Sequence, residues 1–183
     1  MKNFSTLLFI LPAFILFHVN TLNAQKITKP KIDEKKELVA IMQTIETETD
    51  CFFQRDYKCW QQQWVQEGHV FQAWSNADGT FDARTGWTAV DEGIGNYIKN
   101  NPIQEGASSH PKVIRKNQVV KFYSNDVAYL TWDQYNSNPK TGKFRYSKES
   151  RIMEKHNGHW KIAHVSAFWD YSKWWEAEEL RPQ

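Results

Sequence analysis

The chain has 183 residues, 40% of them hydrophobic and 24% charged, which suits one globular domain with a substantial core. It carries 23 basic and 21 acidic residues. This near-neutral balance argues against a nucleic-acid-binding surface, so we do not expect nucleic acid as a partner.

Residues 1–24 have the layout of a secretory signal peptide. Lys2 lies in a short polar start, residues 7–19 form an apolar run, and the small residue Ala24 stands at the expected cleavage point. The apolar run is shorter than the ~20 residues that a helix needs to cross a bilayer. We therefore expect an exported protein, periplasmic or extracellular, with no stable membrane anchor and a mature N-terminus near Gln25.

Two helices are predicted after a charged, aperiodic leader. Apolar residues recur every three to four positions from about residue 33. This stripe consists of Leu38, Ile41, Met42 and Ile45. Asp56 is a suitable N-cap for a second helix, which ends near Gly68 and carries Trp60 and Trp64 on one face.

The only two cysteines, Cys51 and Cys59, both lie in the mature chain, where export would expose them to oxidising conditions. One straight helix would hold them about 12 Å apart, which is too far for a disulfide. Pairing therefore requires a turn between them, and residues 54–56 are candidates for it. Paired and unpaired cysteines both remain open.

Strand patterns dominate the rest of the chain. Residues 69–76 and 80–85 predict a hairpin, and residues 88–100 a third, shorter helix. Four longer strands are predicted over residues 112–123, 127–135, 144–155 and 159–170. Turn sequences separate them, including an Asn-Gly pair at 157–158. Helices followed by an antiparallel meander indicate an α+β fold.

Three segments resemble the nuclear transport factor 2-like superfamily, especially its SnoaL-like branch. They read RDYKCWQQQW, TGWTAVDEGIGNYI and YSKESRIMEKHNGHWKIAHVS, in this order. The resemblance implies a cone-shaped, cystatin-like fold, in which helices cover the concave side of a curved antiparallel sheet and leave a pocket at one end. It also implies pairing of two copies through the convex face, so we expect a homodimer.

On this basis we divide the chain into four parts. They are a signal peptide (1–24), a flexible leader (25–36), the SnoaL-like domain (37–170) and a C-terminal tail (171–183).

Strand alternation suggests which side chains face the pocket. In the last strand His164 shares one face with Trp160 and Ile162, whereas Lys161, on the other face, should prefer water, so we expect His164 inside. The family's kinase association domains carry a pocket arginine in a similar sequence segment. By analogy, we expect Arg151 to lie inside the pocket.

The strand over residues 127–135 offers two alternative inner faces. One contains Tyr129, Thr131, Asp133 and Tyr135; the other contains Ala128, Leu130, Trp132 and Gln134. The first face carries hydroxyl and carboxyl groups, and the resemblance places it in the pocket. The second face is apolar enough to pack against helices.

If Asp133, Arg151 and His164 converge, they form a candidate proton-transfer set. A carboxylate orients an imidazole and raises its pKa, and a guanidinium binds an anionic or enolate oxygen. The competing interpretation is a structural ion pair between Asp133 and Arg151 beside a hydrogen-bonded core histidine.

Five further residues are candidates for lining the pocket: Tyr129, Tyr135, Trp64, Trp74 and His69. An exposed turn is the alternative place for His69. The indole rings would supply large apolar surfaces, each with one hydrogen-bond donor.

Three functions remain open. The first is binding of a small, partly apolar ligand in an aromatic-lined pocket. The second is a cofactor-free dehydratase or isomerase that uses His164 and Asp133, and the third is a non-catalytic assembly module. The sequence has no glycine-rich phosphate loop, nucleophile elbow or zinc-ligand spacing, so we expect neither a cofactor nor a metal.

Overall fold

The computed structural model describes residues 32–103 and 111–181. The predicted signal peptide and most of the predicted leader lie outside these residues. Within them, no helix has the length and apolar character needed to cross a membrane.

Two N-capped helices open the domain, α1 (Glu34–Phe53) and α2 (Tyr57–Gln62). Asp33 accepts a hydrogen bond from the backbone amide of Lys36, and Asp56 accepts one from that of Cys59. Such caps satisfy amides that have no partner within the helix. The predicted N-cap at Asp56 is confirmed, although α2 ends earlier than the sequence suggests.

A tight turn between the two helices brings the cysteines together. Arg55 adopts a positive φ of 58° there, which reverses the chain. Cys51 and Cys59 consequently lie 5.7 Å apart at their Cα atoms and form a disulfide. The structure thus settles the alternative that the sequence left open.

The third predicted helix is divided into α3 (Trp87–Val90), a π-helical turn (Asp91–Gly95) and α4 (Asn96–Asn100). Gly95 lies so close to Asp91 that a Cβ atom on it would approach the carboxylate to 2.1 Å. A larger residue at this point of the turn would therefore force the Asp91 side chain to move.

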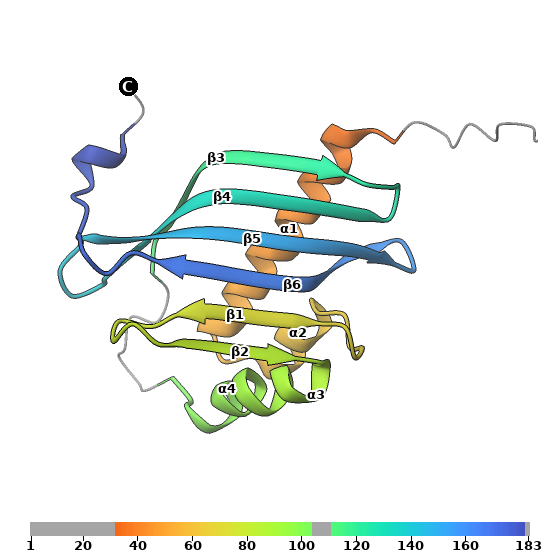
Figure 1. Ribbon diagram of the computed structural model, residues 1–183, viewed down its shortest axis with the longest axis horizontal. Coiled ribbons are helices and arrows are strands. Elements are labelled where there is room, and N and C mark those ends of the chain that lie inside the picture. The colour runs from red at the N-terminus through yellow and green to blue at the C-terminus, as the bar shows by residue number, and fades with distance from the viewer. Residues whose placement is uncertain (1–31, 104–110, 182–183) are drawn as a thin grey trace, which may run out of the picture. The chain divides into compact units, whose positions relative to one another are not determined.

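Six strands form one sheet. They are β1 (Phe71–Ser75), β2 (Phe81–Thr85), β3 (Val113–Phe122), β4 (Val127–Ser137), β5 (Phe144–His156) and β6 (His159–Trp169). Their order is β2-β1-β6-β5-β4-β3, as Figure 1 shows. All neighbours are antiparallel except β1 and β6, which run parallel. The sheet is therefore mixed, whereas the sequence predicts a wholly antiparallel one.

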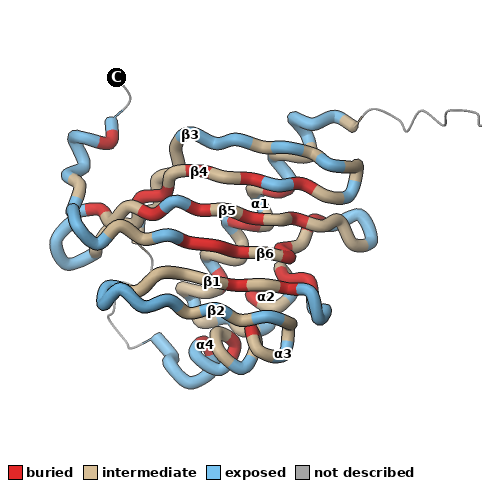
Figure 2. The backbone as a smooth tube through the Cα atoms, in the orientation of Figure 1, coloured by how far each residue is buried: buried red, intermediate tan, exposed pale blue. Residues whose placement is uncertain are grey.

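The sheet has two different faces. In Figure 1, α1 passes behind the central strands, and we name this side the helix-covered face and the other side the open face. Trp132, Leu130 and Met153 are fully buried against Ile41 and Ile45 of α1. Figure 2 shows how buried positions concentrate along β4, β5 and β6. The main core therefore lies between these strands and α1.

The segment after β6 packs against one end of the sheet. Trp175 pairs with Phe144 through two backbone hydrogen bonds, and Leu180, in the short helical turn Glu178–Leu180, is buried with Tyr135. Much of the predicted tail is thus part of the fold.

Candidate functional site

A cavity of about 420 Å³ opens on the helix-covered face, between α1 and the strands β1, β6, β5 and β4. Its aromatic wall consists of Phe52, Phe53, Trp64, Trp74, Trp169 and Tyr171. Its polar lining consists of Glu48, Thr49, Gln72, Asn76, Gln134, Asn136, Glu149 and Arg151. A cavity that combines a broad aromatic wall with several polar groups suits a small, partly apolar molecule.

A buried ion pair forms the floor of the cavity. Arg151 Nη1 donates to Glu149 Oε2 at 2.8 Å, and the two side chains are 10% and 2% exposed. The hydroxyl of Ser147 donates to the other oxygen of Glu149 at 2.6 Å. The Arg151 guanidinium also lies over the Trp132 ring. The charge of Arg151 is therefore compensated inside the protein, as a buried charge requires.

A second carboxyl group, Glu48, reaches the cavity from α1. Burial raises the pKa of Glu48, and the charge of Arg151 and the hydrogen bond from Trp60 Nε1, 2.9 Å long, only partly oppose this effect. The Trp64 indole also lies near this carboxyl group and lowers its pKa, but its Nε1 does not reach hydrogen-bond geometry. Two carboxyl groups with different environments thus line one cavity.

Three buried polar atoms of the cavity lining lack a hydrogen-bond partner among the described residues. They are Arg151 Nε, Trp64 Nε1 and Gln72 Oε1. The three residues are at most 8% exposed. Each unsatisfied group costs roughly 1–3 kcal/mol of folding stability. A bound molecule that offers two acceptors and one donor would remove this cost.

The side chain of Trp74 is held in place by a neighbouring arginine. The guanidinium of Arg84 lies 4.8 Å from the centre of the Trp74 ring, and it is paired with Asp82 on the same strand. Gly93, in the π-helical turn, makes room for this arginine, since a Cβ atom there would lie 2.2 Å from Arg84 Nε. The irregular helix therefore helps to position one wall of the cavity.

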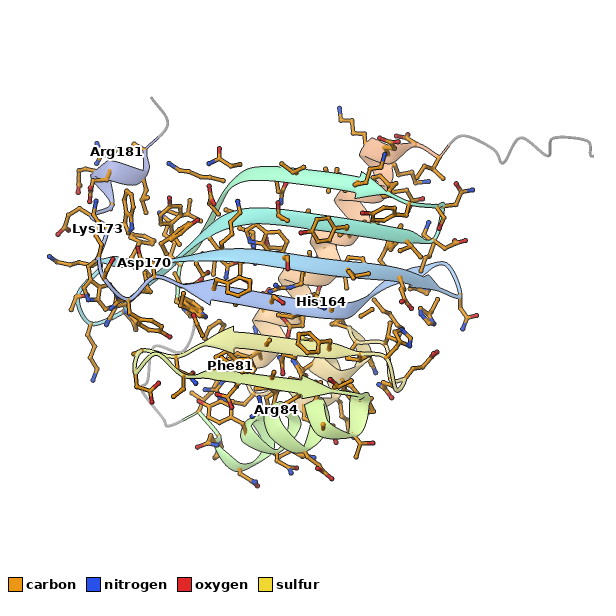
Figure 3. The ribbon with its side chains drawn as sticks, viewed as in Figure 1. Phe81, Arg84, His164, Asp170, Lys173 and Arg181 are labelled. Atoms are coloured by element: carbon orange, nitrogen blue, oxygen red, sulfur yellow. A yellow bond between two sulfur atoms is a disulfide. The ribbon has the colours of Figure 1, made fainter. Side chains whose placement is uncertain are left out.

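The expectation that His164 faces the cavity is wrong. Met153 is paired with Ile162 but Ile152 with His164, so Ala163 is an extra residue in β6. A bulge of one residue reverses the alternation of side chains. Val165 and Ala167 consequently line the cavity, while His164 faces the open side of the sheet. Figure 3 marks His164 on β6, in a view with α1 behind the sheet.

The surroundings of His164 differ from those that the proton-transfer hypothesis requires. Its Nε2 lies 2.8 Å from the hydroxyl of Ser166, and its ring stacks on Phe71 at 5.1 Å. Burial, assisted by the charge of Arg151, lowers the pKa of His164. This direction fits the competing interpretation of a hydrogen-bonded core histidine and not the rise that a neighbouring Asp133 would cause.

Asp133 also lies on the open face. It is paired with Lys148 of β5, whereas His164 is paired with Ile152 of the same strand. Its carboxylate accepts hydrogen bonds from Asn117, Tyr146 and Lys148. Burial opposes ionisation, but these three donors outweigh it and lower the pKa of Asp133. Asp133, Arg151 and His164 do not converge, because only Arg151 points into the cavity.

Of the predicted lining residues, Trp64 and Trp74 line the cavity, and the other three do not. Tyr129 is 37% exposed on the open face, and Tyr135 packs there against Tyr146 and Trp175. His69 lies outside the cavity, where its Nε2 forms a hydrogen bond of 3.1 Å with Glu154 Oε1. Among the two alternative inner faces of β4, the apolar one is inside.

Sequence reasoning missed Glu149, Glu48 and Gln72. Glu149 precedes Arg151 by two residues on an unbroken stretch of strand, so alternation alone would have placed both on one face. Glu48 follows Thr44 and Ile41 at helical spacing, but so do other charged residues of α1. No local sequence pattern indicates Gln72, since its position in the cavity lining depends on the parallel pairing of β1 with β6.

Comparison with known proteins shows similarity at the level of structure. No family model matches the chain, and no curated protein matches it by sequence. An NTF-2 like protein of unknown function from Shewanella oneidensis superposes with a TM-score of 0.53 at 22% identity, over 72% of this chain and 98% of that one.

Two further solved structures are similar. A protein of unknown function with a cystatin-like fold from Nostoc punctiforme gives a TM-score of 0.55 at 13% identity, over 75% of this chain and 93% of that one. The association domain of C. elegans CaMKII gives a TM-score of 0.53 at 17% identity, over 73% of this chain and 96% of that one. The expected NTF2-like, cystatin-like α+β fold is therefore confirmed.

Proposed function

We propose that the protein binds a small, partly apolar molecule in the cavity between α1 and the sheet. The observation that carries this proposal is that Arg151, Trp64 and Gln72 line one cavity, and that each carries a buried polar atom without a partner among the described residues. Native proteins rarely leave buried polar atoms without a hydrogen-bond partner. The ligand would supply their missing partners.

The balance of charges indicates a neutral group at this inner end of the ligand. Arg151 is already paired with Glu149, and the raised pKa of Glu48 favours its uncharged form. A hydroxyl or amide group offers both donor and acceptor without adding a charge. The ring or hydrocarbon body would pack against Trp74, Phe52 and Trp169.

A neutral aromatic probe, 4-hydroxycinnamamide, tests the proposal. Isothermal titration calorimetry should detect binding to the mature wild-type chain. Ala167→Phe should abolish it, because Ala167 lines the cavity and a phenyl ring would fill part of it. The matched control is Ala73→Phe on the open face of β1, which should bind like the wild type. Equal binding by both variants would refute the site.

We also propose that the protein is exported. The support comes from the sequence of residues 1–24 and from the disulfide between Cys51 and Cys59, because structural disulfides persist mainly in oxidising compartments. Intact-mass analysis of the secreted protein should give a chain that starts at or near Gln25.

A homodimer through the open face is the final part of the proposal. Four large apolar side chains on this face are well exposed: Phe81, Val119, Tyr129 and Phe168. Several large apolar side chains exposed on one face of a sheet favour an interaction surface there. The similar structure of a kinase association domain adds support for association between chains.

A further inference from the structure

A second cavity, of about 430 Å³, lies beside the first at the end of the sheet where β4 turns into β5. We name it the outer cavity; it is lined by Asn136, Arg145, Trp174, Lys140 and residues 137–139. The segment after β6 contributes its wall, and Figure 3 marks Asp170 and Lys173 at this end of the sheet. The cavity between α1 and the sheet is called the inner cavity from here on.

The two cavities adjoin each other. Asn136 lines both of them. Its cross-strand neighbour Arg145 places its guanidinium 5.2 Å from the ring of Tyr171, which lines the inner cavity, and 3.8 Å from the ring of Trp174, which lines the outer one. Asn136 is therefore the point at which a molecule in the inner cavity would have to pass to reach the outer cavity.

The outer cavity is positively charged. Arg145 and Lys140 line it and no carboxylate does. Among the described residues neither cation forms an ion pair; Arg145 Nη1 donates only to the carbonyl oxygens of Asp170 and Lys173. The carboxylate of Asp170 senses the charge of Arg145, but it accepts its hydrogen bonds from Ser172. Neither positive charge is thus neutralised by a paired carboxylate among the described residues, unlike that of Arg151.

We infer that the outer cavity binds the anionic end of the ligand, so that the ligand is an elongated aromatic carboxylate whose neutral polar end lies at Arg151. This inference rests on the proposed binding function and adds the class of ligand. Trp174 is 41% exposed and offers a ring face beside the two cations. A planar conjugated carboxylate would place its apolar part against Trp174 and its charge near Lys140.

The experiment compares 4-hydroxycinnamate with its amide, which has the same ring and hydroxyl group but no charge. Binding of each to the mature chain is measured by calorimetry at low and high salt. Lys140→Glu reverses one charge of the outer cavity. Lys121→Glu makes the same change on the open face, where Lys121 is exposed on β3, and serves as the matched control.

We expect the carboxylate to bind more tightly than the amide at low salt. Lys140→Glu should weaken carboxylate binding roughly tenfold, since an attraction between exposed charges is replaced by a repulsion. Lys121→Glu should leave it unchanged, and amide binding should be the same in all three proteins. Added salt should reduce only the preference for the carboxylate.

Three results would overturn the inference. If the amide binds as tightly as the carboxylate, the inner cavity is a binding site but the outer one is not an anion site. If both lysine variants weaken carboxylate binding equally, the effect is that of net charge. If neither compound binds the wild-type chain, the proposed function fails for this class of ligand together with the inference.

Discussion

Replacement of Arg151 by methionine tests whether the floor of the cavity is a true buried ion pair. The change removes the partner of Glu149, a carboxylate that is only 2% exposed and would keep a single hydrogen bond, from Ser147. Loss of one member of a buried pair typically costs about 3–5 kcal/mol, because the remaining charge is uncompensated. We therefore expect a large loss of stability from Arg151→Met.

Urea denaturation, monitored by tryptophan fluorescence, measures this loss. With an m-value of about 2 kcal/mol/M for a domain of this size, a cost of about 4 kcal/mol lowers the urea midpoint by roughly 2 M. Lys148→Met is the matched control, since Lys148 pairs with Asp133 at 3.0 Å but is 47% exposed. Exposed pairs contribute at most about 1 kcal/mol, which corresponds to roughly 0.5 M.

The double variant Glu149→Gln with Arg151→Met separates pairing from packing. If the stability loss comes from an unpaired charge, removal of both charges should restore most of it, with a coupling energy of about 2–3 kcal/mol. Additive losses, or an Arg151→Met cost below about 1 kcal/mol, would contradict the account of the cavity floor given above.

Three further predictions concern other parts of the molecule. NMR titration should give His164 a pKa below the usual value, since burial disfavours its charged form; stability should then fall as the pH drops below about 6.5, and Asp133→Asn should not move this pKa. Cys51→Ser should lower the free energy of unfolding by about 2–3 kcal/mol in chemical denaturation, because the disulfide closes a short loop. Phe168→Glu should convert a dimer into a monomer in light scattering, because Phe168 is exposed on the open face; a monomeric wild type would refute the dimer.

Local chemistry made the arrangement of elements predictable. Asp56 caps α2 as expected, and the Asn-Gly turn adopts the positive φ values, 51° and 82°, that tight hairpins need. The meander strands begin and end within two residues of the predicted positions. These features depend on residues close together in sequence. The parallel pairing of β1 with β6 joins residues about 90 positions apart, and no local pattern indicates it.

The faces of some candidate-site residues follow from strand alternation in the sequence, whereas the faces of others do not. Glu149 and Arg151 share a face because β5 pairs with β4 without interruption, so the alternation inferred from the sequence holds there. His164 changes face because of one extra residue, Ala163, and an alanine in a strand looks the same in sequence whether or not it forms a bulge. The bulge also brings Val165 and Ala167 to the cavity, where small side chains leave space beside Trp74 and Arg151. The extra residue that turns the predicted histidine away from the cavity therefore also places Val165 and Ala167 in the cavity lining.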